Sequence, residues 1–230
     1  MKITQKQFTG KENHSVTHAE AIDFIRRCRA QTNPYKTTGC YFDGQVITAL
    51  LDQPEAVGLR YYYGVTEDDR KVLVLVGTNA ERQNIIGGEP VKLSTFNPAF
   101  TALGEYDPDQ IDHRIALEDA ARLSAHYRSL KQPQQPKGGF FGKQALEQIL
   151  VQQDCVGIRF LFGANTDATP VMVLVGVDQY GADMFFGHVM EFSALCPPFC
   201  GNDDILNSGV AHVSGITFDA DLQPALSKAV

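Results

Sequence analysis

The stretch VGLRYYYG at residues 57–64 recurs in altered form as VGIRFLFG at residues 156–163. A second pair, VLVLVG at residues 72–77 and VMVLVG at residues 171–176, lies at the same separation of 99 residues. Internal repetition at a fixed offset is typical of a duplicated structural unit. These two pairs therefore predict that the chain contains one unit twice.

The same offset extends the similarity beyond these strands. Residues 17–102 align with residues 116–201 without a gap, and 22 of the 86 pairs are identical. Unrelated sequences would share about 5, since each common residue type makes up roughly 6% of a protein. Because the duplication is secure, each copy can be compared with the other. A residue that does the same chemistry in both copies should be present in both.

Each copy is predicted to begin with two helices. The first helix of the first copy opens with THAE at residues 17–20, a capping box followed by apolar residues at helical spacing. A second helix is expected at residues 44–53, with its counterpart at residues 143–152. The loops between the helices, at residues 33–39 and 131–139, are rich in Pro, Gln and Gly, so we expect them at the surface.

Two strands joined by a polar loop follow the helices in each copy, which is the pattern of a β-hairpin. In the first strand, Leu59, Tyr61 and Tyr63 are expected to point to one face and the alternate residues to the other. The second strand is apolar on both faces, as is typical of a buried strand. A third strand is predicted at Met184–Phe192 and, in the first copy, at Ile85–Leu93.

The predicted fold class is α+β. It is a tandem duplication of a helix-helix-β-hairpin unit with a further strand, in which helices pack on an antiparallel sheet and a pseudo-twofold axis relates the copies. We predict an N-terminal tail at residues 1–16, repeat 1 at residues 17–112, repeat 2 at residues 113–209 and a C-terminal extension at residues 210–230. One copy alone is marginal in size for a hydrophobic core, so the repeats are expected to pack as one unit.

The composition is that of a globular protein, with 230 residues, 43% hydrophobic residues and a formal net charge of −7. General nucleic-acid binders usually carry a basic face, so this acidic chain is not expected to bind nucleic acid. No window approaches 18 consecutive apolar residues, and no membrane partner is predicted. The N-terminus lacks a secretory signal, and the odd number of cysteines, five, favours free thiols. A cytoplasmic location is therefore predicted.

The stretch LCPPFCG at residues 195–201 places Cys196 and Cys200 around two prolines. The first copy has FNPAFTA at the corresponding place, so a proline and a phenylalanine recur but the cysteines do not. We expect a plain turn with Phe199 buried in the core and no cofactor. Two alternatives stay open: a disulfide, and a metal or reactive-thiol site in which Cys196, Cys200 and His188 would hold zinc.

Arg60 and Arg159 occupy the same position in the two copies, in the middle of the first hairpin strand. An arginine on a sheet needs a carboxylate, carbonyl oxygens or a bound anion. One hypothesis is therefore a repeated ligand-binding site for a small anion or a peptide carboxylate. The other, which we favour, is that each guanidinium pairs with groups of its own copy. Within the aligned segments no position carries a histidine in both copies, which counts against a duplicated histidine site.

Four motifs of the second copy, FFG, VGIRFLFG, VMVLVGVD and CPPFCG, together resemble an uncharacterised bacterial protein family. Members of that family carry a single copy of the pattern, with a VGIR strand and a C-terminal Cys-Pro-Pro-x-Cys element. The first copy departs from the pattern because it lacks both cysteines. The resemblance implies no activity, but it implies that Cys196 and Cys200 matter in the family.

The motifs of common catalytic sites, such as GxSxG, the P-loop, GxGxxG and HExxH, are absent from the sequence. The residues that recur in both copies are mostly those that build structure. We therefore predict a non-catalytic binding or regulatory module made of two degenerate copies, whose partner is a protein, a peptide or a small anion. The alternative is a thiol- or metal-dependent activity centred on the CPPFC element of repeat 2.

Overall fold

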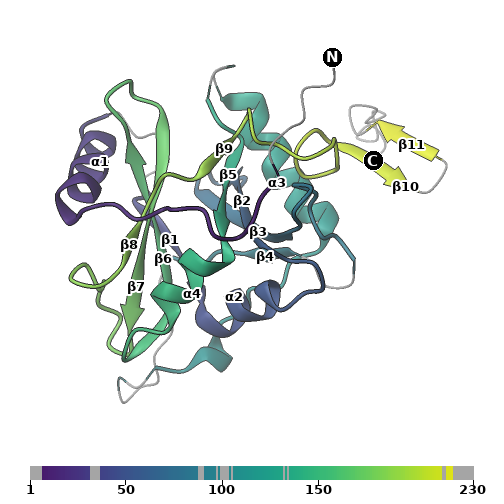
Figure 1. The fold of residues 1–230 in the computed structure, drawn as a ribbon. Coiled ribbons are helices and arrows are strands. Elements are labelled where there is room, and N and C mark those ends of the chain that lie inside the picture. Colours follow the sequence, from purple (N-terminus) through teal and green to yellow (C-terminus); the bar gives the residue numbers. More distant parts are fainter. Residues whose placement is uncertain are drawn as a thin grey trace, which may run out of the picture.

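The computed structural model describes residues 7–31, 37–87, 91–96, 98, 104, 106–131, 133, 135–213 and 216–219. Its helices are α1 (His18–Ala30), α2 (Gly44–Leu51), the 3₁₀ helix η1 (Pro108–Gln110), α3 (Leu117–Leu130) and α4 (Lys143–Leu150). Its strands are β1 (Gly39–Asp43), β2 (Gly58–Val65), β3 (Lys71–Thr78), β4 (Val91–Leu93), β5 (Gly138–Gly142), β6 (Cys155–Ala164), β7 (Pro170–Asp178), β8 (Val189–Met190), β9 (Ala194–Cys196), β10 (Val210–Val213) and β11 (Ile216–Asp219). The predicted α+β class is confirmed (Figure 1).

Side chains cap the N-termini of α1 and α2, but not those of α3 and α4. The capping box of α1 is confirmed: the Thr17 side chain accepts the N–H of Glu20, and the Glu20 carboxylate accepts the N–H of Thr17 at 2.9 Å. The second helix of each repeat, α2 or α4, has only 8 residues. Such short helices are not stable alone, so they depend on burial of their apolar faces. The residues that α2 and α4 bury are Ile47, Leu50, Leu51, Ala145, Leu146 and Ile149.

Two antiparallel sheets form the body of the protein, and each contains strands of both repeats. One has the order β4-β3-β2-β5-β9 and the other the order β1-β6-β7-β8. The hairpins β2–β3 and β6–β7 agree with the sequence pattern. On one side, however, the neighbour of each hairpin comes from the other repeat, because β5 pairs with β2 and β1 pairs with β6. The repeats therefore exchange a strand in both directions.

The exchange has the same register in both sheets. Gly39 pairs with Leu161 in one sheet and Gly138 pairs with Tyr62 in the other, and each residue lies 99 positions from its counterpart. The first helix of each repeat lies on the same sheet as the exchanged strand of that repeat, since α1 packs on β6 and β7 while α3 packs on β2. The first helix and first strand of each repeat thus complete the sheet of the other repeat.

The main hydrophobic core lies between the two sheets, with α2 and α4 at one end of it (Figure 1). Leu59, Tyr61 and Tyr63 of β2 point into this core, as the alternation predicted, whereas Tyr62 belongs to a second cluster beneath α3. A third cluster lies beneath α1. Each sheet is therefore buried on both faces, between the shared core and the first helix of the other repeat.

The exchanged strands β1 and β5 were not predicted from the sequence. GCYFD and GGFFG are each 5 residues long and contain glycine, which is typical of a loop. Glycine here permits close pairing, because a Cβ at Gly39 would lie 2.8 Å from the carbonyl oxygen of Phe160. The predicted third strands are shorter than expected, since β4 covers only the last three residues of Ile85–Leu93 and β8 covers only Val189–Met190 of Met184–Phe192. Most of the loop predicted at residues 33–39 lies outside the described residues.

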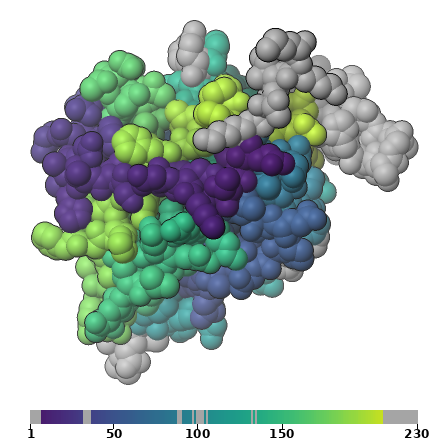
Figure 2. Space-filling model, viewed as in Figure 1, coloured from purple at the N-terminus to yellow at the C-terminus, as the bar shows by residue number. Residues whose placement is uncertain are grey.

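Among the strands of the described residues, β10 and β11 pair only with each other, in the extension predicted at residues 210–230. Residues 7–17 run across the face of the molecule that Figure 2 shows and contact both repeats, since the N–H of Phe8 donates to the carbonyl oxygen of Ala80 and the N–H of Glu191 donates to that of His14. In the described ranges, none of the helices combines the length and the hydropathy that crossing a membrane requires.

The strand exchange predicts that neither repeat folds alone as a monomer. A fragment of residues 1–112 retains β2, β3 and β4 but loses β5 and α3, which leaves one edge and one face of β2 uncovered. We expect this fragment to give the circular dichroism spectrum of an unfolded chain, whereas co-expression with residues 113–230 should restore the folded signal. A monomeric fragment with a cooperative urea transition would contradict the exchange.

Candidate functional site

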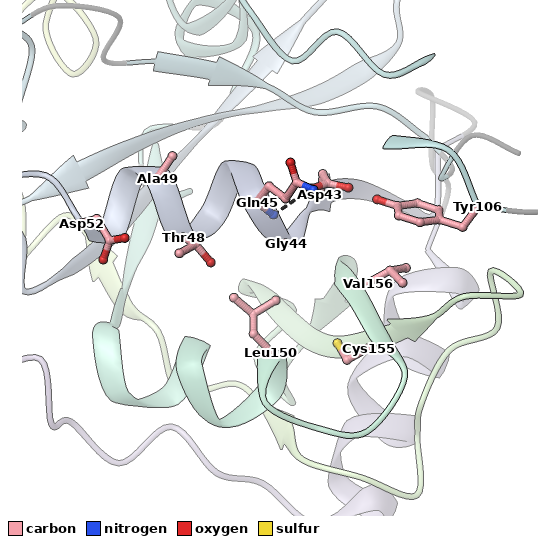
Figure 3. A pocket seen from close by; sticks show the side chains of 10 residues that line it. All are labelled: Asp43, Gly44, Gln45, Thr48, Ala49, Asp52, Tyr106, Leu150, Cys155 and Val156. Atoms are coloured by element: carbon pink, nitrogen blue, oxygen red, sulfur yellow. Dashed lines mark hydrogen bonds between the residues drawn. The ribbon is translucent and has the colours of Figure 1, made fainter. Parts of the chain in front are cut away.

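A pocket of about 600 Å³ opens beside the N-terminus of α2, where the two repeats meet (Figure 3). Its walls come from Asp43 and α2, from the end of α4 and the start of β6, and from Tyr106 near the end of repeat 1. This volume is within the range of small-molecule sites in proteins. The lining residues are Asp43, Gly44, Gln45, Thr48, Ala49, Asp52, Tyr106, Leu150, Cys155 and Val156.

Asp43, the residue that precedes α2, carries the most unusual polar group of this pocket. Its side chain is almost fully buried, since the residue is only 3% exposed. One carboxylate oxygen, Oδ1, accepts the backbone N–H of Gln45 at 2.7 Å and so caps the helix. The other oxygen, Oδ2, is buried and has no hydrogen-bond partner among the described residues. Burial raises the pKa of this carboxyl above its ordinary value, against the opposing effects of the helix cap and of His113.

The equivalent place beside the N-terminus of α4 holds no such pocket wall, because residues 9–12 of the chain occupy it. Gly142 precedes α4 there, and this helix has no side-chain cap. The backbone carbonyl of Gly10 takes that role, since it accepts the N–H of Gln144 at 2.9 Å. Residues 9–12 therefore lie against Gly142 and Val57, at the position where the first half has its pocket.

Glycine at position 10 is what allows this close approach. Its φ is +77°, and a Cβ there would lie 2.5 Å from the carbonyl oxygen of Val57. The residue 99 positions later is Asp109, whose side chain could not occupy such a place. Asp109 lies in η1 instead, and the side chain of Asp43 supplies the helix cap. The pocket beside α2 thus accompanies two sequence differences: Asp43 stands where the other copy has Gly142, and Asp109 stands where the other copy has Gly10.

A smaller pocket of about 330 Å³ adjoins the first one, because Asp43 lines both. Residues of η1 and His113 contribute to its walls. One basic side chain of this pocket, Arg114, binds the carboxylate of Asp112 through two N–H groups, each at 3.0 Å. The charge of that arginine is therefore compensated within its own segment.

Two buried histidines bind the segments that precede α1 and α3 to the backbone at the starts of α4 and α2. The ring Nε2 of His113 accepts the backbone N–H of Asp43 at 3.3 Å. The ring Nε2 of His14 accepts the backbone N–H of Gly142 at 3.0 Å. Both members of each pair lie 99 residues from their counterparts, so the molecule uses the same contact twice.

Both imidazoles are held in one tautomer. A backbone N–H can only donate, so each Nε2 is unprotonated and each Nδ1 carries the proton. Nδ1 of His113 lies 2.8 Å from the carbonyl oxygen of Leu93, and Nδ1 of His14 lies 3.0 Å from that of Phe192. Burial lowers the pKa of both histidines. They are neutral structural links in which both ring nitrogens are already engaged.

The sequence contained this histidine pair, but the repeat alignment stopped short of it. The aligned segments begin at residues 17 and 116, three positions after His14 and His113. The positions on either side of the two histidines differ between the copies, so one shared residue carried little signal. An alignment that begins at residues 14 and 113 includes this pair at the same separation of 99 residues.

The side chain of Arg60 donates hydrogen bonds to groups inside the fold and lines neither pocket. Its guanidinium is fully buried and donates to the carbonyl oxygen of Arg82 at 3.0 Å and to Oδ1 of Asn84 at 3.1 Å. It also donates to the carbonyl oxygen of Phe199 at 3.0 Å. The first two contacts lie within its own copy, as we expected, whereas the last contact reaches into the other repeat.

Arg159 has an equivalent environment. It forms an ion pair with Asp183 at 2.5 Å and donates to the carbonyl oxygen of Phe96 in the other repeat at 3.0 Å. Asp183 lies 99 residues after Asn84, which binds Arg60. Because each arginine holds a loop of the opposite repeat, these contacts support the structural interpretation rather than an anion site.

Cys196 and Cys200 form a disulfide, with their Cα atoms 4.7 Å apart. The expectation of a plain turn was therefore wrong, and so was the expected burial of Phe199, whose exposed fraction is 39%. The turn is held by covalent closure and by the bond from Arg60 to the backbone of Phe199, so it needs no buried ring. The counterpart, Phe100, lies outside the described residues. The other cysteines, Cys28, Cys40 and Cys155, are free thiols.

The residues considered for zinc do not form a metal group. A cysteine binds metal as a thiolate, and both cysteines of the CPPFC element are bound to each other. His188 is exposed, and its backbone N–H donates to the Gln152 side chain at 2.8 Å. Throughout the described ranges, no three or more His, Cys, Asp and Glu side chains are grouped so that they could hold a metal ion.

Comparison of the chain with protein-family models, with curated proteins and with solved structures found no match. The resemblance to a bacterial family with a Cys-Pro-Pro-x-Cys element therefore stays a prediction.

The buried histidine pair predicts a loss of stability in mild acid. In an unfolded chain the pKa of a histidine is about 6.5, whereas burial lowers the pKa of His14 and His113 in the folded protein. Below that pH the unfolded chain binds protons that the folded chain does not, so the free energy of unfolding falls as the pH drops. Urea denaturation between about pH 7.5 and 5.5 should show this decline.

The double variant His14→Gln/His113→Gln should lose most of this pH dependence. At neutral pH it should also be less stable than the wild type, because the glutamine amide can replace Nε2 as acceptor but cannot also replace Nδ1 as donor to the carbonyl of Leu93 or Phe192. Each buried carbonyl left without its donor should cost about 1–3 kcal/mol. His188→Gln, at an exposed position, is the control and should change neither property. A wild-type stability that stays constant across this pH range would contradict the prediction.

Removal of the disulfide should destabilise the protein. The double variant Cys196→Asn/Cys200→Thr restores the residues of the first copy, and we expect it to lose about 2 kcal/mol, the chain-entropy value for so short a closed loop. Urea denaturation measures this loss. A reducing agent should lower the stability of the wild type by a similar amount and leave that of the variant unchanged. Equal stabilities of variant and wild type would show that the disulfide contributes nothing.

Proposed function

We propose that this protein is a non-catalytic binding module whose ligand site is the pocket beside the N-terminus of α2. The observation that carries the proposal is the difference between the two halves. At one helix start, residues 9–12 cover the surface and the carbonyl of Gly10 caps the helix. At the other, a pocket of about 600 Å³ is present, and a buried oxygen of Asp43 has no hydrogen-bond partner among the described residues.

The chemical state of the pocket supports binding rather than catalysis. Burial raises the pKa of the Cys155 thiol, which keeps it protonated and weakly nucleophilic. The nearby His113 has both ring nitrogens engaged with the backbone, so it is not available as a general base. The lining residues therefore offer hydrogen bonds and apolar contacts but no activated nucleophile.

The size of the pocket favours a small molecule among the partners considered. A pocket lined by 10 residues can enclose much of a small ligand but little of a folded protein. Arg60 and Arg159, the residues considered for an anion, have partners inside the fold. The ligand is thus expected to contact α2, the end of α4 and the start of β6.

A second candidate function has one observation in its favour. The Cys196–Cys200 disulfide closes an exposed loop in which Cys200 is partly accessible, so an external thiolate could attack its sulfur and release Cys196. This is the thiol-dependent alternative. We rank it second because the disulfide loop is held by Arg60 as a structural element.

Filling the pocket should abolish ligand binding without unfolding the protein. Ala49 is exposed on α2 and lines the pocket, so Ala49→Trp should occupy the cavity. In a thermal-shift screen of small polar molecules, a ligand at 100 times its Kd should raise the melting temperature of the wild type by roughly 5 °C or more. The same compound should not shift Ala49→Trp.

The repeat offers a matched control for this experiment. Gln148 occupies the equivalent position on α4, so Gln148→Trp places the same bulky side chain away from the pocket. This variant should respond to the compound like the wild type. A screen without hits, or hits that shift Ala49→Trp as much as the wild type, would count against the pocket as the binding site.

A further inference from the structure

We propose that the CPPFC loop is a site of thiol–disulfide exchange, at which a low-molecular-weight thiol forms a mixed disulfide with Cys200 and Arg60 stabilises the thiolate form of Cys200. This inference develops the second candidate function and does not depend on the pocket beside α2. It is argued from the unequal burial of the two cysteines, from the position of Arg60 and from a difference between the two repeats.

The two cysteines of the loop differ in exposure. Cys196, the last residue of β9, is completely buried, and its carbonyl oxygen accepts the N–H of Lys137 at 2.7 Å. Cys200 is partly exposed and follows residues 197–199, all of which are exposed. Since exchange depends on access to the sulfur that is attacked, a thiol from solvent is expected to attack Cys200 and to release Cys196.

The exchange needs a thiol and no other reactant. A thiolate attacks the sulfur of Cys200, the bond between the two cysteines breaks, and its electron pair leaves with Cys196, which takes up a proton. A second thiolate then attacks the sulfur of the bound thiol, and Cys200 leaves as a thiolate. Two thiols are thereby oxidised to one disulfide while the protein disulfide is reduced, and a low-molecular-weight disulfide reverses both steps.

Arg60 lies against the backbone on both sides of Cys200. Its Nη2 donates to the carbonyl oxygen of Phe199 at 3.0 Å, and a Cβ on Gly201 would lie 3.4 Å from its Nη1. The guanidinium is fully buried, so solvent screens its charge only weakly. A cation next to a cysteine favours the thiolate. Arg60 is thus a positioning residue that acts through Cys200.

The two repeats differ in how the charge of this arginine is compensated. Arg159 pairs directly with the carboxylate of Asp183. Arg60 donates instead to the neutral amide of Asn84, and that amide donates to Oδ2 of Asp204 at 2.7 Å. Asn84 and Asp183 occupy the same position in the two copies. The arginine whose nearest carboxylate lies one amide away is therefore the one beside the cysteines, where a positive charge can stabilise a thiolate.

Further charged residues surround the loop, two of each sign. They are Arg82, Lys137, Asp203 and Asp204. Because opposite charges are balanced among these four, we assign the effect to Arg60, which contacts the backbone of both neighbours of Cys200.

The first test identifies the cysteine that is attacked. The full chain is incubated with excess reduced glutathione, quenched with acid and mapped by mass spectrometry. We expect a mixed disulfide on Cys200 and none on Cys196. Burial raises the pKa of the free thiols Cys28, Cys40 and Cys155, so these should react slowly. A protein without any adduct on Cys200, or with the adduct on Cys196, would overturn the inference.

The second test measures the effect of Arg60 on the reduced protein. The rate at which iodoacetamide alkylates Cys200 between about pH 5 and 9 should give a pKa below about 8.5, the ordinary value of a free cysteine. Asn84→Asp copies the other repeat and gives Arg60 a carboxylate partner, so it should slow alkylation at pH 7 roughly threefold or more. Asp183→Asn, the opposite change in the other repeat, is the matched control and should leave the rate at Cys200 unchanged.

The outcomes separate the parts of this inference. An ordinary pKa of Cys200 would show that Arg60 has only a structural role, and the wild-type profile decides this even if Asn84→Asp does not fold. Failure of both tests would leave the disulfide as a structural link alone. The proposed binding site is tested separately by Ala49→Trp, whose result none of these outcomes changes.

Discussion

The reciprocal exchange of β1 and β5 is the constraint on which the rest of this structure depends. Each exchanged strand brings its backbone N–H and C=O groups to the hairpin of the other repeat, with the same register on both sides. Buried backbone groups must be paired, so neither sheet is complete without the opposite repeat. The shared core, the crossed positions of α1 and α3, and the junction that contains the pocket all follow from this exchange.

The two halves use equivalent contacts to hold the exchanged segments in place. His14 and His113 bind the backbone at the starts of α4 and α2, and Arg60 and Arg159 each reach a loop of the opposite repeat. His14, His113 and Arg60 are buried and Arg159 is partly buried, because these side chains link the repeats, which explains why polar residues recur in a core region. The halves differ at the helix caps, where a backbone carbonyl serves α4 and an aspartate serves α2.

Much of the fold could be predicted from local patterns, whereas most of the candidate site could not. The capping box of α1, the hairpins and the alternation along β2 are local properties of the chain, and the structure bears them out. The strands β1 and β5 have no such pattern, since short glycine-containing segments become strands only when another strand pairs with them. The CPPFC element was wrongly interpreted as a plain turn, because a five-residue segment does not reveal whether its two cysteines meet.

The sequence by itself determined the α+β class, the 99-residue repeat and the face to which each β2 residue points, because these depend on spacing along the chain. Only the tertiary structure decided which repeat each strand joins and which groups Arg60 binds. It also decided where a cavity remains. Asp43 lies at the wall of this cavity, which no pattern around residue 43 indicates. Burial and pairing arise from contacts between distant segments, and no local pattern encodes them.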